Sequence, residues 1–142
     1  MTRTMTIALL FLVMTTALVV GSSLQSLLPR IHGTLSPVLE PLAIETVTDK
    51  GDGWSRIAGT AVKHKDCTWV RTEWFVGDIN GRAASTKMVY GDKPQTRGPG
   101  LLSWSKIDVL LSPEQVRTNS YAYTYHDCGW PWLIRSLYYQ SD

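Results

Sequence analysis

Two short segments of the chain place a histidine close to a cysteine. The first is His64-Lys65-Asp66-Cys67 and the second is His126-Asp127-Cys128. Thiolate and imidazole are the common ligands of zinc and copper, so one interpretation is a metal site. Its ligands would be His64, Cys67, His126 and Cys128. The other interpretation is a Cys67–Cys128 disulfide, the usual state of an even number of cysteines in an oxidising compartment. We expect the disulfide, and the metal site is the alternative.

Aromatic residues alternate near the end of the chain. Tyr121, Tyr123 and Tyr125 are two residues apart, so a strand would place all three rings on one face. Those rings would either pack against a second sheet or form a flat face for a glycan or a partner protein. Trp130 and Trp132 follow, and they would cover the end of the domain, anchor a partner or contact lipid headgroups.

A loop rich in glycine and proline, residues 91–100, contains Lys93 and Arg97. It is too long for a tight hairpin, and it is either a connector or a loop that contacts a partner. The candidate binding surface therefore consists of Tyr121, Tyr123, Tyr125, Trp130, Trp132, Lys93 and Arg97.

The chemistry of enzymes and of nucleic-acid binding is not visible in the sequence. There is no nucleophile elbow, His-Glu-x-x-His helix, Walker loop or Gly-x-Gly-x-x-Gly turn. The net charge is only +2 and no run of lysine and arginine forms a basic patch. We therefore expect a protein without a cofactor that is neither an enzyme nor a nucleic-acid-binding protein; a small extracytoplasmic hydrolase is the less favoured alternative.

An uncharged segment runs from Thr4 to Pro29 and carries no polar face at helical spacing. Residues 5–28 are long enough to span a bilayer of about 30 Å. The segment is either a single-pass anchor, with the bulk of the chain outside the cytoplasm because Arg3 precedes it, or a signal peptide cut near residues 21–23. We assign residues 1–28 to this membrane segment, and the secreted protein is the alternative.

The rest of the chain divides into a proline-rich linker, residues 29–41, and one extracytoplasmic domain, residues 42–142. Pro29 is expected to end the helix, and the prolines that follow favour an extended chain. About seven short β-type segments follow at intervals of eight to fifteen residues, without amphipathic helices between them. In one of them Val70, Thr72, Trp74 and Val76 alternate and would share a face. This spacing predicts an all-β fold, an antiparallel sandwich.

The positions of the two cysteines resemble those of an immunoglobulin-like sandwich, with the second cysteine near the end of the penultimate strand. The passage from Leu111-x-Pro113 to Tyr121 is similar to that of fibronectin type III domains. The residue two before Cys128 is His126 and not tyrosine, so the resemblance implies a fold and carries over no functional residue. We expect a membrane-anchored or exported β-sandwich that acts as a binding or accessory module for a protein or a surface polymer.

Overall fold

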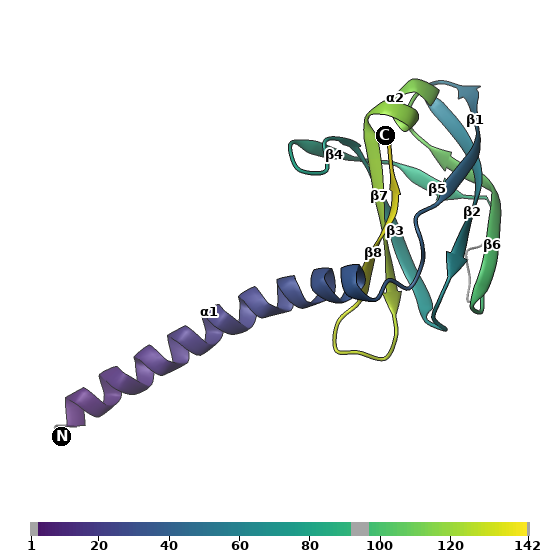
Figure 1. The fold of residues 1–142 in the computed structure, drawn as a ribbon. Coiled ribbons are helices and arrows are strands. Elements are labelled where there is room, and N and C mark those ends of the chain that lie inside the picture. Colours follow the sequence, from purple (N-terminus) through teal and green to yellow (C-terminus); the bar gives the residue numbers. More distant parts are fainter. Residues whose placement is uncertain (1–2, 92–96, 142) are drawn as a thin grey trace.

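The computed structural model describes residues 3–91 and 97–141. Within the N-terminal helix it describes the side chains of residues 7, 10–21, 24 and 27–35. Lys93, one of the candidate binding residues, lies outside the described residues. The described chain forms a long helix followed by two antiparallel sheets that pack face to face (Figure 1). The expected β-sandwich is therefore confirmed.

Each sheet has four strands. The first has the order β1-β2-β6-β5 and the second β4-β3-β7-β8. The strands are β1 (Ala43–Gly51), β2 (Trp54–Lys63), β3 (Thr68–Gly77), β4 (Ala83–Thr86), β5 (Met88–Tyr90), β6 (Gly100–Val109), β7 (Ser120–Asp127) and β8 (Ile134–Gln140). Residues 83–90 form two strands that are separated at Lys87: β4 pairs with β3, and β5 pairs with β6 in the other sheet. The sandwich therefore has eight strands among the described residues instead of about seven.

The core lies between the two sheets and alternates with outward residues along each strand. Ile57 of β2 and Ile107 of β6 face Trp74 of β3 and Ala122 of β7, and all four are fully buried. A short helix, α2 (Pro113–Thr118), closes one end of this core with Val116. Its first turn is held by a capping box between Ser112 and Gln115, which satisfies backbone N–H groups that the helix leaves free.

The disulfide expected between Cys67 and Cys128 is present. The two cysteines flank β3 and β7, and Thr68 lies opposite Asp127 in the ladder between these strands. The bond therefore joins two neighbouring strands of one sheet at the end of their ladder, and it does not cross the core. Val38 and Ile134 pack around it as a small second apolar cluster.

The N-terminal helix, α1 (Arg3–Leu35), continues past Pro29, so the expectation that this proline ends the helix is wrong. Residues 30–35 of the expected 29–41 linker are helical. A proline inside a helix removes one backbone hydrogen bond, and the turn that follows Pro29 packs on the sandwich through His32 and Gly33. Among the described residues, no helix combines the length and hydropathy needed to cross a membrane, so the expected spanning helix is not confirmed.

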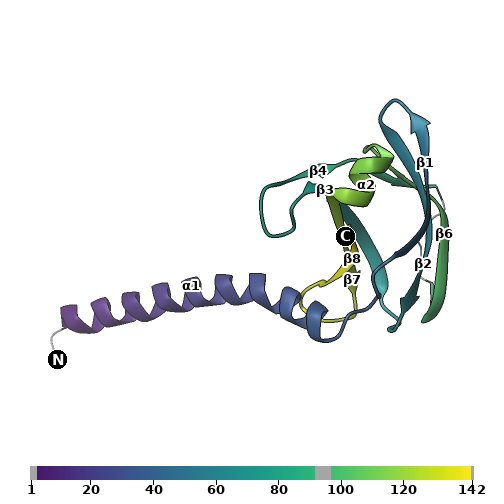
Figure 2. The same cartoon turned by 45° about the horizontal axis from the view of Figure 1, so that its top comes forward.

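The end of α1 packs directly on the backbone of β8. Gly33 is buried there, and a Cβ at this position would overlap the carbonyl oxygen of Arg135. The His32 ring meets the Trp130 ring edge-on, with ring centroids 5.3 Å apart. Figures 1 and 2 show the helix leaving the sandwich on the side of the β4-β3-β7-β8 sheet. The absence of a side chain at residue 33 therefore sets how closely the helix approaches the sheet.

We predict that replacing both cysteines, in C67S/C128S, lowers the free energy of unfolding by about 4 kcal/mol, because the bond closes a long loop of the unfolded chain. Urea unfolding of the two proteins measures the difference, and intact mass after alkylation without reductant verifies that the parent thiols are paired. A difference below about 1 kcal/mol would contradict the structural role given to this bond.

We predict that Gly33→Ala separates α1 from β8, because the added methyl group overlaps a backbone carbonyl that cannot rotate away. A destabilisation of about 1–3 kcal/mol is expected for such overpacking. Thermal unfolding of the full chain in nonionic detergent micelles measures it. Gly21→Ala is the matched control, since a Cβ at Gly21 of the same helix meets no atom within 4 Å. Equal unfolding temperatures for the two variants would show that the helix does not pack as described.

Candidate functional site

The three alternating tyrosines lie on the outer face of the β4-β3-β7-β8 sheet. Ala122, Thr124 and His126 point into the sandwich and are 0–3% exposed. Tyr121, Tyr123 and Tyr125 point the other way and together line one hollow. The rings therefore share a face, and that face is not the one packed against the second sheet.

On this face, one arginine covers the last of the three tyrosines. The Arg71 guanidinium lies 4.0 Å above the centre of the Tyr125 ring and pairs with Glu73 at 2.8 Å. The Tyr125 hydroxyl donates to the other oxygen of Glu73 at 2.9 Å. Burial alone would raise the pKa of Glu73, but the hydrogen bonds from Arg71 and Tyr125 outweigh it and hold the pKa below its ordinary value. Glu73 is thus a carboxylate already occupied by two donors.

A second arginine stacks on the central tyrosine. The Arg135 guanidinium of β8 lies 4.1 Å above the centre of the Tyr123 ring. Phe75 stacks on Tyr121 at 5.1 Å and meets Tyr123 edge-on. Contacts of this cation–π and stacked kind fix the positions of the rings. The face, named here the arginine–tyrosine face, consists of Arg71, Glu73, Phe75, Tyr121, Tyr123, Tyr125 and Arg135.

A groove of about 440 Å³ runs across the arginine–tyrosine face. Arg30 of α1 lines one side of it, and Ile79 and Asn80, from the turn between β3 and β4, line the other. A second hollow of about 320 Å³ lies beside the first and shares Arg30, Tyr123 and Arg135 with it. No acidic residue lines either hollow within the described chain. Arg30 and Arg135 therefore lie together in two hollows without an acidic lining residue, and Glu73 is the carboxylate on which the charge of Arg135 also acts.

The two tryptophans of the candidate surface lie in the connection between β7 and β8. Their rings stack at 5.7 Å, and Trp130, 54% exposed, also contacts His32 of α1. The two tryptophans thus lie beside the end of the N-terminal helix, and the ring of Trp130 remains partly exposed there.

Arg97 does not join this surface. Its side chain donates to the carbonyl oxygen of Ser103 at 2.7 Å and lies above the ring of Trp104 in the first sheet. Its own carbonyl accepts from Lys63. Arg97 therefore helps to close the sandwich and does not extend the arginine–tyrosine face.

The alternative metal site does not occur in this structure. Cys67 and Cys128 are bonded to each other, so neither offers a thiolate. His64 pairs with Glu40 at 2.8 Å on the surface, whereas His126 is buried between the sheets. Within residues 3–91 and 97–141, no group of three or more potential ligand side chains is close enough to hold a metal ion.

A small cavity lies inside the sandwich near the disulfide, with a volume of about 20 Å³. Lys63 and His126 line it, both less than 5% exposed. The Lys63 ammonium donates to the carbonyl oxygens of Cys67 and Arg97 at 2.7 and 2.5 Å. Burial, aided by the charge of Lys63, lowers the pKa of His126 to about 4. A space of this size holds about one water molecule and no organic ligand, so we interpret the cavity as structural.

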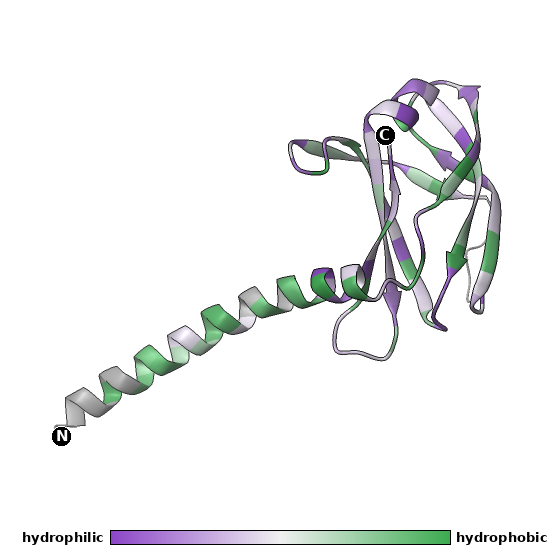
Figure 3. Cartoon of the chain, in the orientation of Figure 1, coloured by the Kyte–Doolittle hydropathy of each residue, from purple (hydrophilic) through white to green (hydrophobic). Residues whose placement is uncertain are grey.

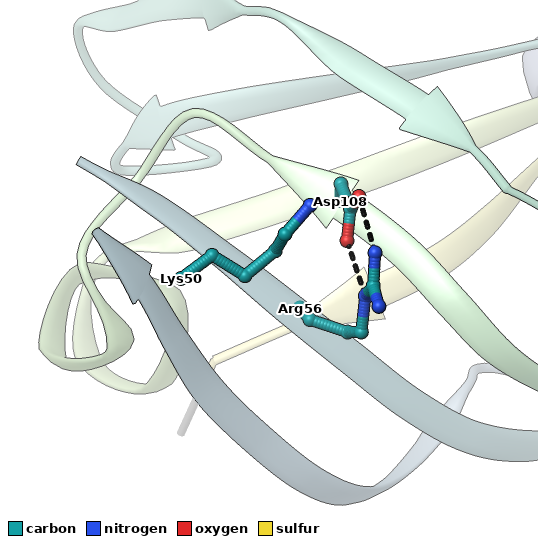
Figure 4. A network of polar contacts seen from close by, with 3 residues as sticks. All are labelled: Lys50, Arg56 and Asp108. Carbon is teal, nitrogen blue, oxygen red and sulfur yellow. Dashed lines mark hydrogen bonds and ion pairs between the residues drawn. The ribbon is translucent and has the colours of Figure 1, made fainter. Parts of the chain in front are cut away.

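A third polar cluster lies on the first sheet (Figure 4). Asp108 accepts from Arg56 at 2.8 Å and from Lys50 at 2.7 Å. The hydrogen bond from Arg56 in particular, with that from Lys50, lowers the pKa of Asp108 to about 2. Because both cations pair with one carboxylate, this cluster ties β1, β2 and β6 together.

Sequence reasoning found the tyrosines by their alternation but missed the arginines that accompany them. Arg135 alternates with the buried Ile134 and Ser136, which was a detectable signal of an outward position. Arg30 gave no signal, because its place depends on the helix continuing past Pro29.

Guanidinium edges bind carboxylate and phosphate through paired hydrogen bonds, so the groove is suited to an anionic group. None of its residues forms the nucleophile–base pair that covalent catalysis uses.

We predict that acidification destabilises the fold through His126. Its pKa of about 4 in the folded protein lies below the ordinary 6.5. The unfolded chain therefore takes up the proton first, and stability is lost as the pH falls from about 6.5 towards about 4, by up to about 3 kcal/mol. Urea unfolding across this range measures the slope, and His126→Gln should show a flatter one. Identical slopes would rule out His126 as the group responsible.

Comparison of the chain with protein-family models, with curated proteins and with solved structures finds no match.

Proposed function

We propose that the chain is a membrane-anchored, extracytoplasmic binding module that holds an anionic group of a partner in the groove of its arginine–tyrosine face. The observation that carries this proposal is the occurrence of Arg30 and Arg135 in one groove of about 440 Å³ without an acidic lining residue. A groove of that volume is within the range of ordinary ligand sites. The absence of a nucleophile–base pair at this site favours binding over catalysis.

Helix α1 supports the membrane part of the proposal. Every residue from Leu10 to Val20 is exposed, and Phe11 and Leu18 are 72% and 69% exposed. Figure 3 shows hydrophobic colour along most of the described helix and hydrophilic colour where it reaches the sandwich. Apolar side chains exposed on all sides of a helix are stable in lipid and unfavourable in water.

The disulfide supports a place outside the cytoplasm, since such bonds persist in oxidising compartments. The strand orders β1-β2-β6-β5 and β4-β3-β7-β8 support an immunoglobulin-like arrangement, in which strands 1, 2, 5 and 4 of a seven-stranded sandwich form one sheet. Here the disulfide lies within one sheet, unlike the inter-sheet bond of antibody domains. Many unrelated binding modules use this architecture as a scaffold.

The packing of the arginine–tyrosine face favours an anion over a neutral glycan. A sugar ring stacks on an aromatic ring whose face is free, but here Arg71 covers Tyr125 and Arg135 covers Tyr123. The cation of this face that is not in an ion pair is then Arg135, since Arg71 pairs with Glu73. Burial raises the pKa of Tyr121, so its hydroxyl stays protonated, whereas the Tyr125 hydroxyl already donates to Glu73.

We predict that the full chain in nonionic detergent micelles binds polyglutamate and that Arg30→Gln/Arg135→Gln weakens this binding about tenfold or more, because two charge-assisted contacts are lost. Titration with a fluorescent polyglutamate peptide measures the Kd. The interaction should weaken with salt, since the groove is open to solvent.

Arg117→Gln is the matched control, because Arg117 is exposed on α2 at the other end of the sandwich. Polyglutamate binding that is equally strong in the double variant would contradict the proposed site. Turnover of a substrate by the purified chain would contradict the non-catalytic assignment.

A further inference from the structure

The groove of the arginine–tyrosine face opens on the side from which α1 leaves the sandwich. In both views the helix and the turn between β3 and β4 extend from the same side of the molecule, away from the first sheet (Figures 1 and 2). Arg30 and Ile79 bring these two projections to the edges of one groove. A bilayer that holds the apolar part of α1 would therefore face the arginine–tyrosine face.

The position of Arg30 along α1 determines its depth in the membrane. Leu27 is apolar and exposed, and Arg30 follows three residues later, about 4.5 Å further along the helix. A helix that keeps Leu27 in hydrocarbon thus places Arg30 among the lipid headgroups. Trp130 contacts His32 at the same level and is 54% exposed, as expected for tryptophan at a membrane interface.

Charge on the arginine–tyrosine face favours the phosphate of an anionic lipid. Arg30, Arg71 and Arg135 carry three positive charges, and Glu73 supplies one negative charge that Arg71 already pairs with. Asp78 lies beside Tyr121, at the end of the face away from the helix. Within the described chain, the guanidinium groups of Arg30 and Arg135 form no close ion pair with a carboxylate, and the charge of Arg135 acts on Glu73 from a longer distance.

From these observations we infer that Arg30 and Arg135 bind the phosphate of an anionic phospholipid of the membrane in which α1 is anchored, so that the arginine–tyrosine face lies on the bilayer surface. This inference rests on the proposed function and names the ligand of the same groove. Each guanidinium can donate two parallel hydrogen bonds to phosphate oxygens. Tyr123 and Asn80 line the same groove and can supply further polar contacts for the headgroup.

Residue-resolved hydroxyl-radical labelling of the full chain in vesicles tests this inference. One vesicle contains phosphatidylcholine with about a third phosphatidylglycerol, and the other contains phosphatidylcholine alone. We expect labelling of Tyr123 and Tyr125 to be several-fold slower in the anionic vesicles. Labelling of Trp54, on the first sheet, should be the same in both.

In the double variant Arg30→Gln/Arg135→Gln, Tyr123 and Tyr125 should be labelled equally fast in both kinds of vesicle. The Arg117→Gln variant should give the same labelling rates as the parent protein. Arg30→Gln alone, at an exposed helical position, keeps the test valid if Arg135→Gln disturbs β8. Equal labelling of the parent in both vesicles would overturn the inference. So would protection of the tyrosines by inorganic phosphate with phosphatidylcholine vesicles, because the ligand would then be a free anion.

The result with polyglutamate separates the two proposals. If the full chain binds polyglutamate through Arg30 and Arg135 but its tyrosines are not protected by anionic vesicles, the lipid is excluded and the anion-binding function remains. If the arginine substitutions change neither the Kd for polyglutamate nor the labelling rates of the tyrosines in anionic vesicles, both proposals fail.

Discussion

The close approach of Gly33 to the backbone of β8 is the contact on which the candidate site depends. Because residue 33 has no side chain, the last turns of α1 lie directly against the carbonyl of Arg135. Arg30 is three residues earlier in the same helix, so this contact also brings its guanidinium to the groove that Arg135 lines. Without it the groove would lose one wall, and the arginine–tyrosine face would be a flat sheet surface.

The two faces of the second sheet have different physical roles because of strict alternation along β7. Ala122, Thr124 and His126 fill the space between the sheets, where small and medium side chains leave room for the large Trp74 and Trp104. The tyrosines consequently point to the outer face, where Tyr121 is stacked on Phe75 and is only 8% exposed. There, arginines from β3 and β8 stack on two of the rings, which reduces exposed aromatic surface and concentrates positive charge. That face therefore carries a net positive charge.

The fold class, the disulfide and the common face of the tyrosines followed from the sequence because each depends on local spacing. Other features depended on tertiary contacts. Pro29 favoured the end of a helix, but packing of His32 and Gly33 on the sandwich extends it to Leu35. The ladder between β3 and β7 shifts register between Trp69 and Arg71, so Val70 leaves the face expected from its alternation with Trp74 and is 41% exposed. The groove joins Arg30 to Arg135, positions that no sequence motif relates.

The most direct test of this account is whether α1 and the sandwich form one body at the contact between His32 and Trp130. Their ring centroids are 5.3 Å apart, close enough for proton–proton Overhauser effects between the rings. Nuclear magnetic resonance of the full chain in nonionic micelles measures these effects directly. The account predicts cross-peaks between the His32 and Trp130 ring protons. Their absence in a well-folded sample, with the helix tumbling independently of the strands, would contradict it.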